Sequence, residues 1–113
     1  MPRYLISFDD GAMDHIADAD WPEVARASHA VVREAKAAGI WIFGCGLQRQ
    51  LSTIVSIDGH VSAGPAQESK TVIGGLSIIE VSTRDEAHLW AARIAAGCRC
   101  AQEVREIMFD AES

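Results

Sequence analysis

The first third of the chain predicts a strand, a polar loop and a long helix. Arg3–Phe8 has the composition of a short strand, and Asp9-Asp10-Gly11 is a turn signal that ends it. The loop that follows is rich in aspartate (Asp9, Asp10, Asp14, Asp18 and Asp20). We expect the Asp20 carboxylate to cap a helix that begins at Trp21 and closes at Gly39. Small and apolar residues recur on one face of this helix: Val24, Ala27, Ser28, Val31, Val32, Ala35 and Ala38.

The middle of the chain predicts strands and a hairpin. Ile40–Leu47 is typical of a buried strand, with glycines that indicate a bulge or a close approach. Ser52–Ile57 alternates between polar and apolar residues, and Asp58-Gly59 predicts a type I′ turn that pairs it with His60–Ala63. After a loop at 64–70, Thr71–Val81 predicts a long strand, in which Gly74-Gly75 indicates a bulge.

A second helix and a last strand complete the pattern. Thr83 and Glu86 form a capping-box pair. The apolar face of the helix comprises Ala87, Trp90, Ala91 and Ile94, and we expect Gly97 to end it. Gln102–Phe109 predicts the last strand. The order is β-α-β-(β-hairpin)-β-α-β, which predicts one α+β domain over 1–113: a ferredoxin-like βαββαβ fold with an added hairpin, a mainly antiparallel sheet and both helices on one face.

Such a sheet leaves its second face uncovered. Ile40, Ile42 and Gly44 alternate with Trp41, Phe43 and Cys45, so both faces of this strand are apolar and require burial. We therefore expect a homodimer that packs sheet to sheet.

Composition excludes several classes of function. The chain has 113 residues, 16 acids, 10 Lys and Arg, and a net charge of −6, which disfavours nucleic-acid binding. It has no apolar run long enough for a membrane span and no signal-peptide pattern, so we expect a cytoplasmic protein without membrane contact. Three cysteines cannot form a complete set of disulfides, and Cys98-x-Cys100 lacks the spacing of a zinc or redox pair. We expect Cys45 to be a core residue, and we expect no disulfide, metal or cofactor.

Residues 61–81 read VSAGPAQESKTVIGGLSIIEV and resemble the signature segment of the DGPF-type members of the YCII-related family. Upstream, AAGIWIFGCGLQ at 37–48 resembles the family's Ala-Gly strand, and the second helix and the last strand resemble theirs as well. The namesake Asp and Phe of the motif are Ala63 and Ala66 here. If that Asp contributes to catalysis in relatives, this chain has lost it.

The resemblance implies a dimeric α/β barrel fold. It also implies kinship with small enzymes of aromatic degradation, so one hypothesis is a cofactor-independent isomerase or lyase that moves a proton on an anionic or aromatic substrate. The alternative is a non-catalytic ligand-binding or accessory protein, which would use a pocket lined by Trp41, Phe43 and Trp90. Fold analogy alone does not separate the two.

The family pattern includes Glu68 and Lys70. Lys70 would hold an anionic substrate and Glu68 would carry the proton, unless the two form a salt bridge that pins the loop. His29 resembles a histidine proposed for catalysis in smaller YCII proteins and also follows an Arg, here Arg26. The helical period, however, places His29 opposite the apolar stripe.

Three further candidates come from the residues themselves. Arg105 alternates with Glu103 on the last strand, where it would clamp a substrate carboxylate or form an ion pair at the dimer seam. Asp9 ends the first strand and is either a substrate-contacting base or part of a plain turn. Asp14, His15 and Asp18 would form a metal site only if the loop folds around an ion; a solvated loop is the alternative.

Overall fold

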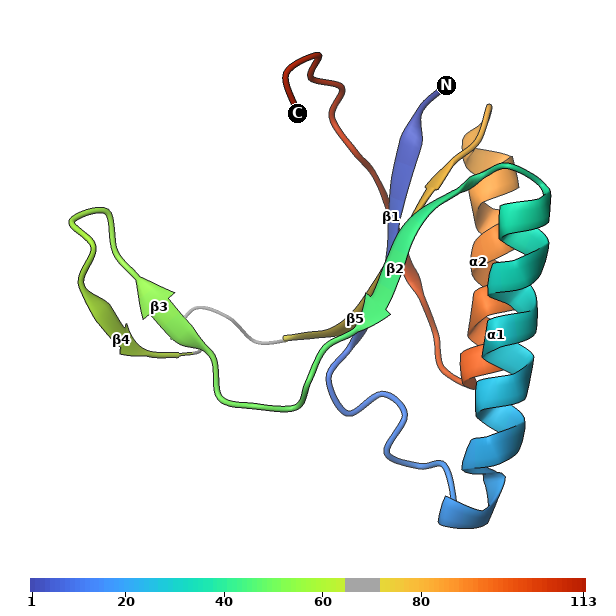
Figure 1. Cartoon of the computed structure of the whole chain (residues 1–113), viewed down its shortest axis with the longest axis horizontal. Coiled ribbons are helices and arrows are strands. Elements are labelled where there is room, and N and C mark those ends of the chain that lie inside the picture. Colours follow the sequence, from blue (N-terminus) through green and yellow to red (C-terminus); the bar gives the residue numbers. More distant parts are fainter. Residues whose placement is uncertain (65–71) are drawn as a thin grey trace.

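We analysed a computed structural model that describes residues 1–64 and 72–113 (Figure 1). Along the chain lie β1 (Arg3–Asp9), a short 3₁₀ turn (Asp18–Asp20), α1 (Trp21–Ala37), β2 (Trp41–Gly46), β3 (Thr53–Val55), β4 (Val61–Ala63), β5 (Ile73–Glu80), α2 (Arg84–Cys98) and β6 (Glu103–Glu106). The predicted order of elements is therefore confirmed. The last strand is shorter than predicted, because only Glu103–Glu106 pair with β1.

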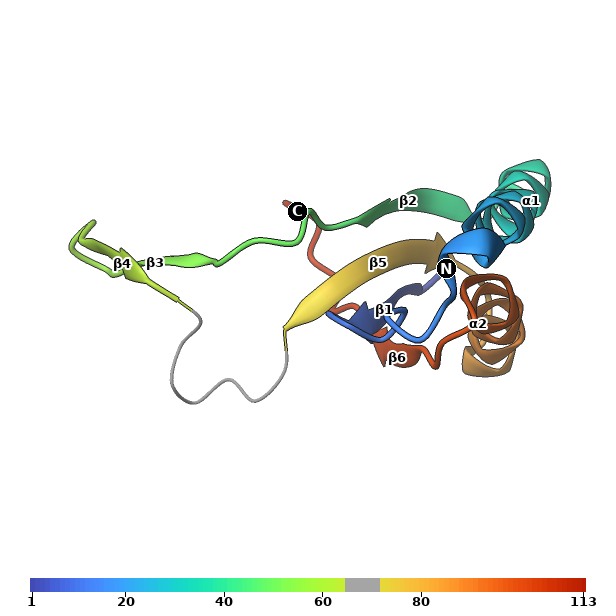
Figure 2. The same cartoon turned by 90° about the horizontal axis from the view of Figure 1, so that it is seen from below.

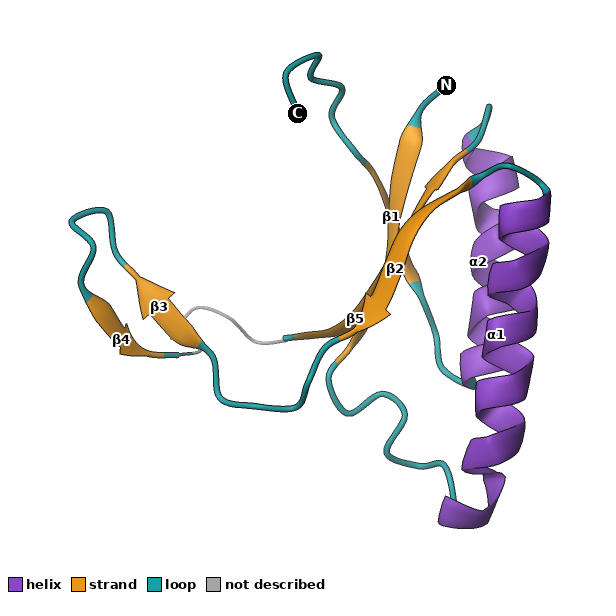
Figure 3. Cartoon of the chain, viewed as in Figure 1, coloured by secondary structure: helices purple, strands orange, loops and turns teal. Residues whose placement is uncertain are grey.

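Four strands form an antiparallel sheet in the order β2-β5-β1-β6. Both helices cover one face of this sheet, and β3 and β4 form a separate two-stranded hairpin on the other side (Figures 2 and 3). This is the ferredoxin-like α+β fold that the sequence predicts. Neither helix in the described part of the chain is long and apolar enough to cross a membrane.

The core lies between the central strands and α2. Tyr4 and Ile6 of β1 and Ile79 of β5 are almost completely buried. They pack with Val81 and with the helix residues Ala87, Ala91 and Ile94. Residues opposite each other on antiparallel strands share a face, so the pairing of Tyr4 with Ile79 places both under the helices. The alternating pattern of the sequence thus specifies which face of the sheet is covered.

Gly97 does not end α2, contrary to the prediction. It is buried inside the helix, where a Cβ would lie 3.1 Å from the Cα of Ser28 on α1. The glycine therefore allows the two helices to approach closely. The helix ends one residue later, and Arg99 adopts the left-handed conformation at φ 56°.

The two predicted N-caps behave differently. Thr83 accepts a hydrogen bond from the Glu86 amide at 3.2 Å, as the capping-box pattern predicts. Asp20 occupies the N-cap position of α1 but makes no side-chain cap, so that prediction is wrong. Its carboxylate instead accepts a hydrogen bond from Arg99 Nη1 at 3.2 Å, which links the start of α1 to the end of α2.

The predicted bulge in β5 is present. Phe8 pairs with Gly75, but Asp9 pairs with Ile73, so Gly74 is the extra residue. A Cβ on Gly74 would lie 2.9 Å from the Cα of Asp10, which explains the need for glycine. The bulge places the end of β1, where the candidate site lies, close against β5.

The hairpin forms as predicted, but its turn is not type I′. Only Gly59 has a positive φ, 87°, whereas type I′ requires two such residues. The Gly59 amide bonds to the Ser56 carbonyl at 2.9 Å, and the Asp58 carboxylate accepts from the His60 amide at 3.0 Å. The Asp58 side chain therefore organises a longer loop, which removes the need for a second positive φ.

The prediction of a buried strand at 40–47 is also wrong for the single chain. The strand is β2, at the edge of the sheet, and the side chain of Phe43 is 54% exposed. Cys45 is exposed as well, not part of the core. Both residues lie on the face that the helices leave uncovered, because they pair with Ile78 and Leu76 of β5.

Candidate functional site

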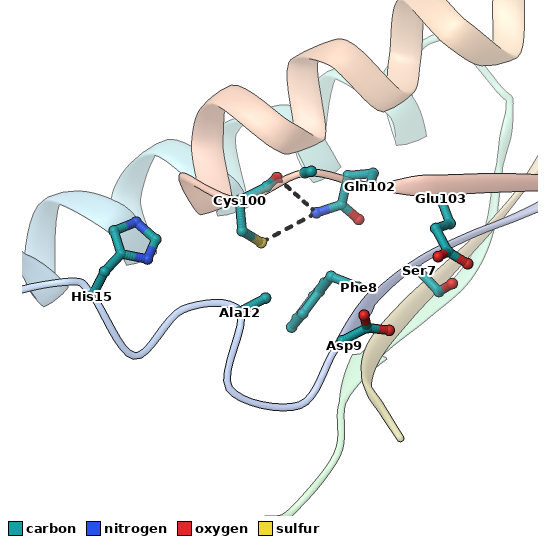
Figure 4. Close-up of a pocket in the computed structure, with 9 residues that line it drawn as sticks. Ser7, Phe8, Asp9, Ala12, His15, Cys100, Gln102 and Glu103 are labelled. Carbon is teal, nitrogen blue, oxygen red and sulfur yellow. Dashed lines mark hydrogen bonds between the residues drawn. The ribbon is translucent and has the colours of Figure 1, made fainter. Parts of the chain in front are cut away.

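A pocket of about 390 Å³ lies where β1 ends and β6 begins (Figure 4). Because the two strands are antiparallel neighbours, the last residues of one adjoin the first residues of the other. The lining residues come from β1, the loop after it and the connection from α2 into β6: Ser7, Phe8, Asp9, Ala12, His15, Cys100, Ala101, Gln102 and Glu103. Its volume is within the range of small-molecule sites.

The ionisable groups lie at two ends of this pocket. Asp9 and Glu103 lie together near Ser7, whereas His15 lies beyond Phe8 and Ala12 (Figure 4). Ser7 and Glu103 are directly paired across β1 and β6. A small molecule over the Phe8 ring would therefore have carboxylates on one side and an imidazole on the other.

Cys100 and Gln102 form a further wall of the pocket. The Gln102 amide donates to the Cys100 carbonyl at 3.3 Å and lies 3.5 Å from its sulfur. Burial raises the pKa of the Cys100 thiol above its ordinary value, and the hydrogen bond from Gln102 only partly opposes this. The thiol is therefore protonated at neutral pH, which disfavours a role as a thiolate nucleophile.

The loop that carries His15 is fixed at several points. Ile16, the next residue, is 7% exposed and anchors the loop. Gly11, at φ 86°, allows the tight turn in which the Ala12 amide bonds to the Asp9 carbonyl at 3.0 Å. Arg49 then binds the loop from outside, with its Nη2 2.9 Å from Asp14 Oδ1 and its Nε 3.3 Å from Asp10 Oδ1.

The structure brings one of the predicted site residues into the pocket, Asp9. Arg105 lies two residues beyond Glu103, opposite Leu5 on the uncovered face of the sheet, and does not line the pocket. His29 is exposed on α1 and is not a lining residue either. Glu68 and Lys70 lie outside the described residues.

Sequence reasoning missed His15 and Glu103 as pocket residues. The Asp-rich pattern indicates His15 only as a candidate metal ligand, and Asp14 instead accepts a hydrogen bond from Arg49. Among the described residues, no group of three or more His, Cys, Asp or Glu is placed to hold a metal ion. The signal that could have found both residues is topological, since β1 and β6 are neighbours in this fold and their connecting loops meet.

The aromatic residues named in the ligand-binding hypothesis do not come together. Trp41 of β2 and Trp90 of α2 pack against the core, on the side of the sheet that the helices cover. Phe43 lies on the opposite face of the sheet, where it pairs with Ile78. These three side chains therefore do not line one pocket.

A model of the YCII-related domain matches residues 22–109. The chain belongs to the YCII-related family. The matched region runs from α1 to the segment after β6. The resemblance to the family therefore extends from the 61–81 motif over most of the chain. A search of curated proteins found no match.

A solved structure has the same overall fold. It is 5-chloro-2-hydroxyhydroquinone dehydrochlorinase (TftG) from Burkholderia phenoliruptrix AC1100, in complex with 2,5-dihydroxybenzoquinone. The similarity covers 99% of this chain and 98% of that chain, with a TM-score of 0.53 and 17% sequence identity. At this identity the likeness establishes the fold of this YCII-related chain and leaves its activity to be argued from the site.

Proposed function

We propose that this protein is a cofactor-independent enzyme of the isomerase or lyase type, which transfers a proton on a small aromatic substrate in the pocket between β1 and β6. The observation that carries the proposal is the arrangement of Asp9, Phe8 and His15 around one cavity of about 390 Å³. Titratable groups that converge on a concave site of this size are typical of an active site.

The chemistry of the lining favours a hydroxylated ring over a carboxylate. Asp9 and Glu103 are both acids, and they would repel an anionic group at their end of the pocket. A phenolic hydroxyl, in contrast, donates a hydrogen bond to a carboxylate, while the ring stacks on Phe8. The structural neighbour's complex with a dihydroxybenzoquinone supports this substrate class, by analogy of fold.

In this scheme Asp9 accepts a proton from the ring hydroxyl and His15 donates a proton at the other end of the ring, and exchange with solvent then restores both groups. General acid–base groups of this kind contribute about 10²- to 10⁴-fold to a rate. Glu103, opposite Ser7, would orient the hydroxyl. No nucleophilic cysteine is required, in agreement with the raised pKa of the Cys100 thiol.

The test is turnover of chlorinated hydroxyhydroquinones and hydroxybenzoquinones, followed by their ultraviolet and visible spectra. We expect Asp9→Asn and His15→Gln each to lower kcat by 10²-fold or more, with the free energy of unfolding unchanged. His88→Gln, on an exposed position of α2, is the matched control. His29→Gln tests the other candidate histidine.

Each outcome separates the hypotheses. Loss of turnover with His29→Gln but not with His15→Gln would mean that the active site lies at α1 and not in this pocket. Binding without turnover in the wild-type protein would support the ligand-binding alternative. If neither Asp9→Asn nor His15→Gln changed the rate of a true substrate, the pocket assignment would be wrong.

We also propose that the protein is a homodimer that pairs through the uncovered face of its sheet. Leu5, Ile78 and Phe43 form a row across three strands on that face, and Leu76 and Cys45 belong to the next row. An apolar surface of this kind is typical of an interface between subunits. The mass measured by light scattering tests the pairing.

A further inference from the structure

We propose that the β3–β4 hairpin is an arm that grips a second copy of this chain. The inference rests on the homodimer proposed above and adds a second contact to it. In Figures 1 and 2 the hairpin stands away from the body of the molecule, on the side of the sheet opposite the helices. This is the same side as the uncovered apolar face.

The hairpin is two-sided. Val55 and Val61 are directly paired, so their side chains share one face, and both are more than half exposed. Ile54 pairs with Ser62 on the other face. Two more apolar residues, Leu51 before β3 and Ile57 in the turn, are almost fully exposed.

An isolated two-stranded hairpin is at best marginally stable in water. Its apolar face therefore requires a surface to pack on, and the rest of the described chain does not supply one, because Val55 and Val61 both stay more than half exposed.

The size of the exposed surface indicates a subunit as the partner. The chain of 12.2 kDa exposes 7944 Å². A compact monomer of this mass exposes about 6,100 Å², so the excess is about 1,800 Å² per chain. Two chains would together have about 3,700 Å² to cover, which is within the range of obligate homodimers. The radius of gyration, 15.8 Å, likewise exceeds the value of about 13 Å for a compact domain of this length.

The charge of the arm favours the same partner. Residues 51–64 contain one acid, Asp58, and no Lys or Arg. The Asp58 carboxylate is used within the turn, where it accepts from Ser56 and from the His60 amide. The arm thus offers no Lys or Arg to a nucleic acid, an acidic peptide or an anionic membrane. The row of Leu5, Phe43 and Ile78 on the uncovered sheet face has the matching apolar character, whereas Arg105 lies beside Leu5 on the edge strand β6.

The test uses two neighbouring residues on opposite faces of β4. Val61→Asp and Ser62→Asp add the same charge one residue apart, and both positions are exposed in the single chain. We expect Val61→Asp to weaken the dimer at least tenfold in Kd, measured by sedimentation equilibrium on the full chain. Ser62→Asp should change Kd less than threefold, and circular dichroism should report the same fold in both variants.

A second measurement covers the case in which Val61→Asp disturbs the hairpin itself. A photo-crosslinking amino acid at position 57, in place of Ile57, is irradiated in a mixture of isotopically heavy and light chains. We expect heavy–light crosslinks to peptides of β1, β2 or β5.

The outcomes distinguish the arm from the dimer and from the activity. A wild-type monomer at tens of micromolar overturns both the pairing and the arm. A dimer that Val61→Asp does not weaken, with crosslinks only within one chain, overturns the arm alone. Crosslinks to an added protein of another sequence in place of the second copy would also overturn it. Turnover is measured separately, so the assignment of the pocket does not depend on these results.

Discussion

The ring of Phe8 lies across Gly75 on the neighbouring strand, in the space that any larger side chain at position 75 would occupy. The two residues are direct partners in the antiparallel pairing of β1 and β5. Phe8 is also a wall of the candidate pocket, next to Asp9. The absence of a side chain at Gly75 therefore determines where the pocket wall stands.

We predict that Gly75→Ala destabilises the protein by about 1–3 kcal/mol, because the new methyl group overlaps the Phe8 ring. The measurement is chemical denaturation. Gly46→Ala is the matched control, since Gly46 is the direct partner of Gly75 on β2 and a Cβ there would meet nothing within 4 Å. In a Phe8→Ala background, Gly75→Ala should destabilise the protein less. An equal cost in both backgrounds would contradict the steric explanation.

The second prediction concerns Arg49, which joins Asp10 and Asp14 of the pocket loop. All three side chains are roughly half exposed or more, so the ion pairs contribute little to global stability. We expect Arg49→Gln to leave global unfolding almost unchanged while hydrogen exchange of residues 11–15 becomes faster. In high salt the wild-type loop should also exchange faster, because salt screens exposed ion pairs. The difference in exchange between wild type and variant should therefore become smaller.

The control for this effect is Arg93→Gln. Arg93 forms a similarly exposed ion pair with Glu34, which joins the two helices far from the loop in sequence. Faster exchange at residues 11–15 in that variant as well would show a general loosening in place of a local one.

The sequence predicted the fold more fully than the site, and particular residues show why. Alternation in β1 and the helical period of α2 identify Tyr4 and Ala87 as core residues, since burial follows local periodicity. The pocket has His15 at one end and Glu103 at the other, and these residues are far apart in the sequence and have no shared local pattern. Strand order brings them together, so only a reading of topology could have found the pair.

Two predictions, the helix end at Gly97 and the type I′ turn at Asp58-Gly59, are wrong for the same reason. Local rules favour a helix end at Gly97, but its role is set by Ser28 on another helix. The dipeptide Asp58-Gly59 favours a type I′ turn, but the Asp58 side chain bonds within the loop. In both cases the deciding contact is made by a group that a local motif does not include.

The third prediction tests the close approach of the two helices at Gly97. A side chain there would be directed at Ser28 Cα and the Ala27 carbonyl, 3.1 and 3.3 Å from the Cβ. We expect Gly97→Val to destabilise the protein by more than 3 kcal/mol, or to prevent folding. Ala96→Val, one residue earlier on the exposed side of α2, should cost only about 0.5–1 kcal/mol through helix propensity. Similar costs at both positions would mean that the helices separate freely.

The fourth prediction follows from Cys98, whose thiol pKa is raised by burial and by the neighbouring Cys100. The folded protein holds this thiol protonated at a pH where the unfolded chain has begun to ionise it. The stabilising contribution is therefore complete below the ordinary pKa of 9.0 and is lost as the pH rises through the raised folded value. Above pH 9.0 we expect the denaturation midpoint of the wild type to decrease with rising pH, and that of Cys98→Ala to decrease less. A steeper fall in that variant would contradict this sign.

The last prediction uses Cys45 as a reporter of the uncovered sheet face. Its side chain is exposed in the single chain and lies in the row of Leu76 and Ser7, within the surface proposed to pair. In a Cys98→Ala/Cys100→Ala background we expect its reaction with a thiol reagent to slow as protein concentration rises, since pairing covers the sulfur. Val61→Asp should restore the fast rate at a concentration where Ser62→Asp does not, because only the first variant weakens the arm contact. The variant His88→Cys, on the exposed side of α2 in a background with Cys45→Ser, should react at one rate at all concentrations. If the reaction rate of Cys45 were also independent of protein concentration, the sheet face would remain uncovered and the proposed pairing would be wrong.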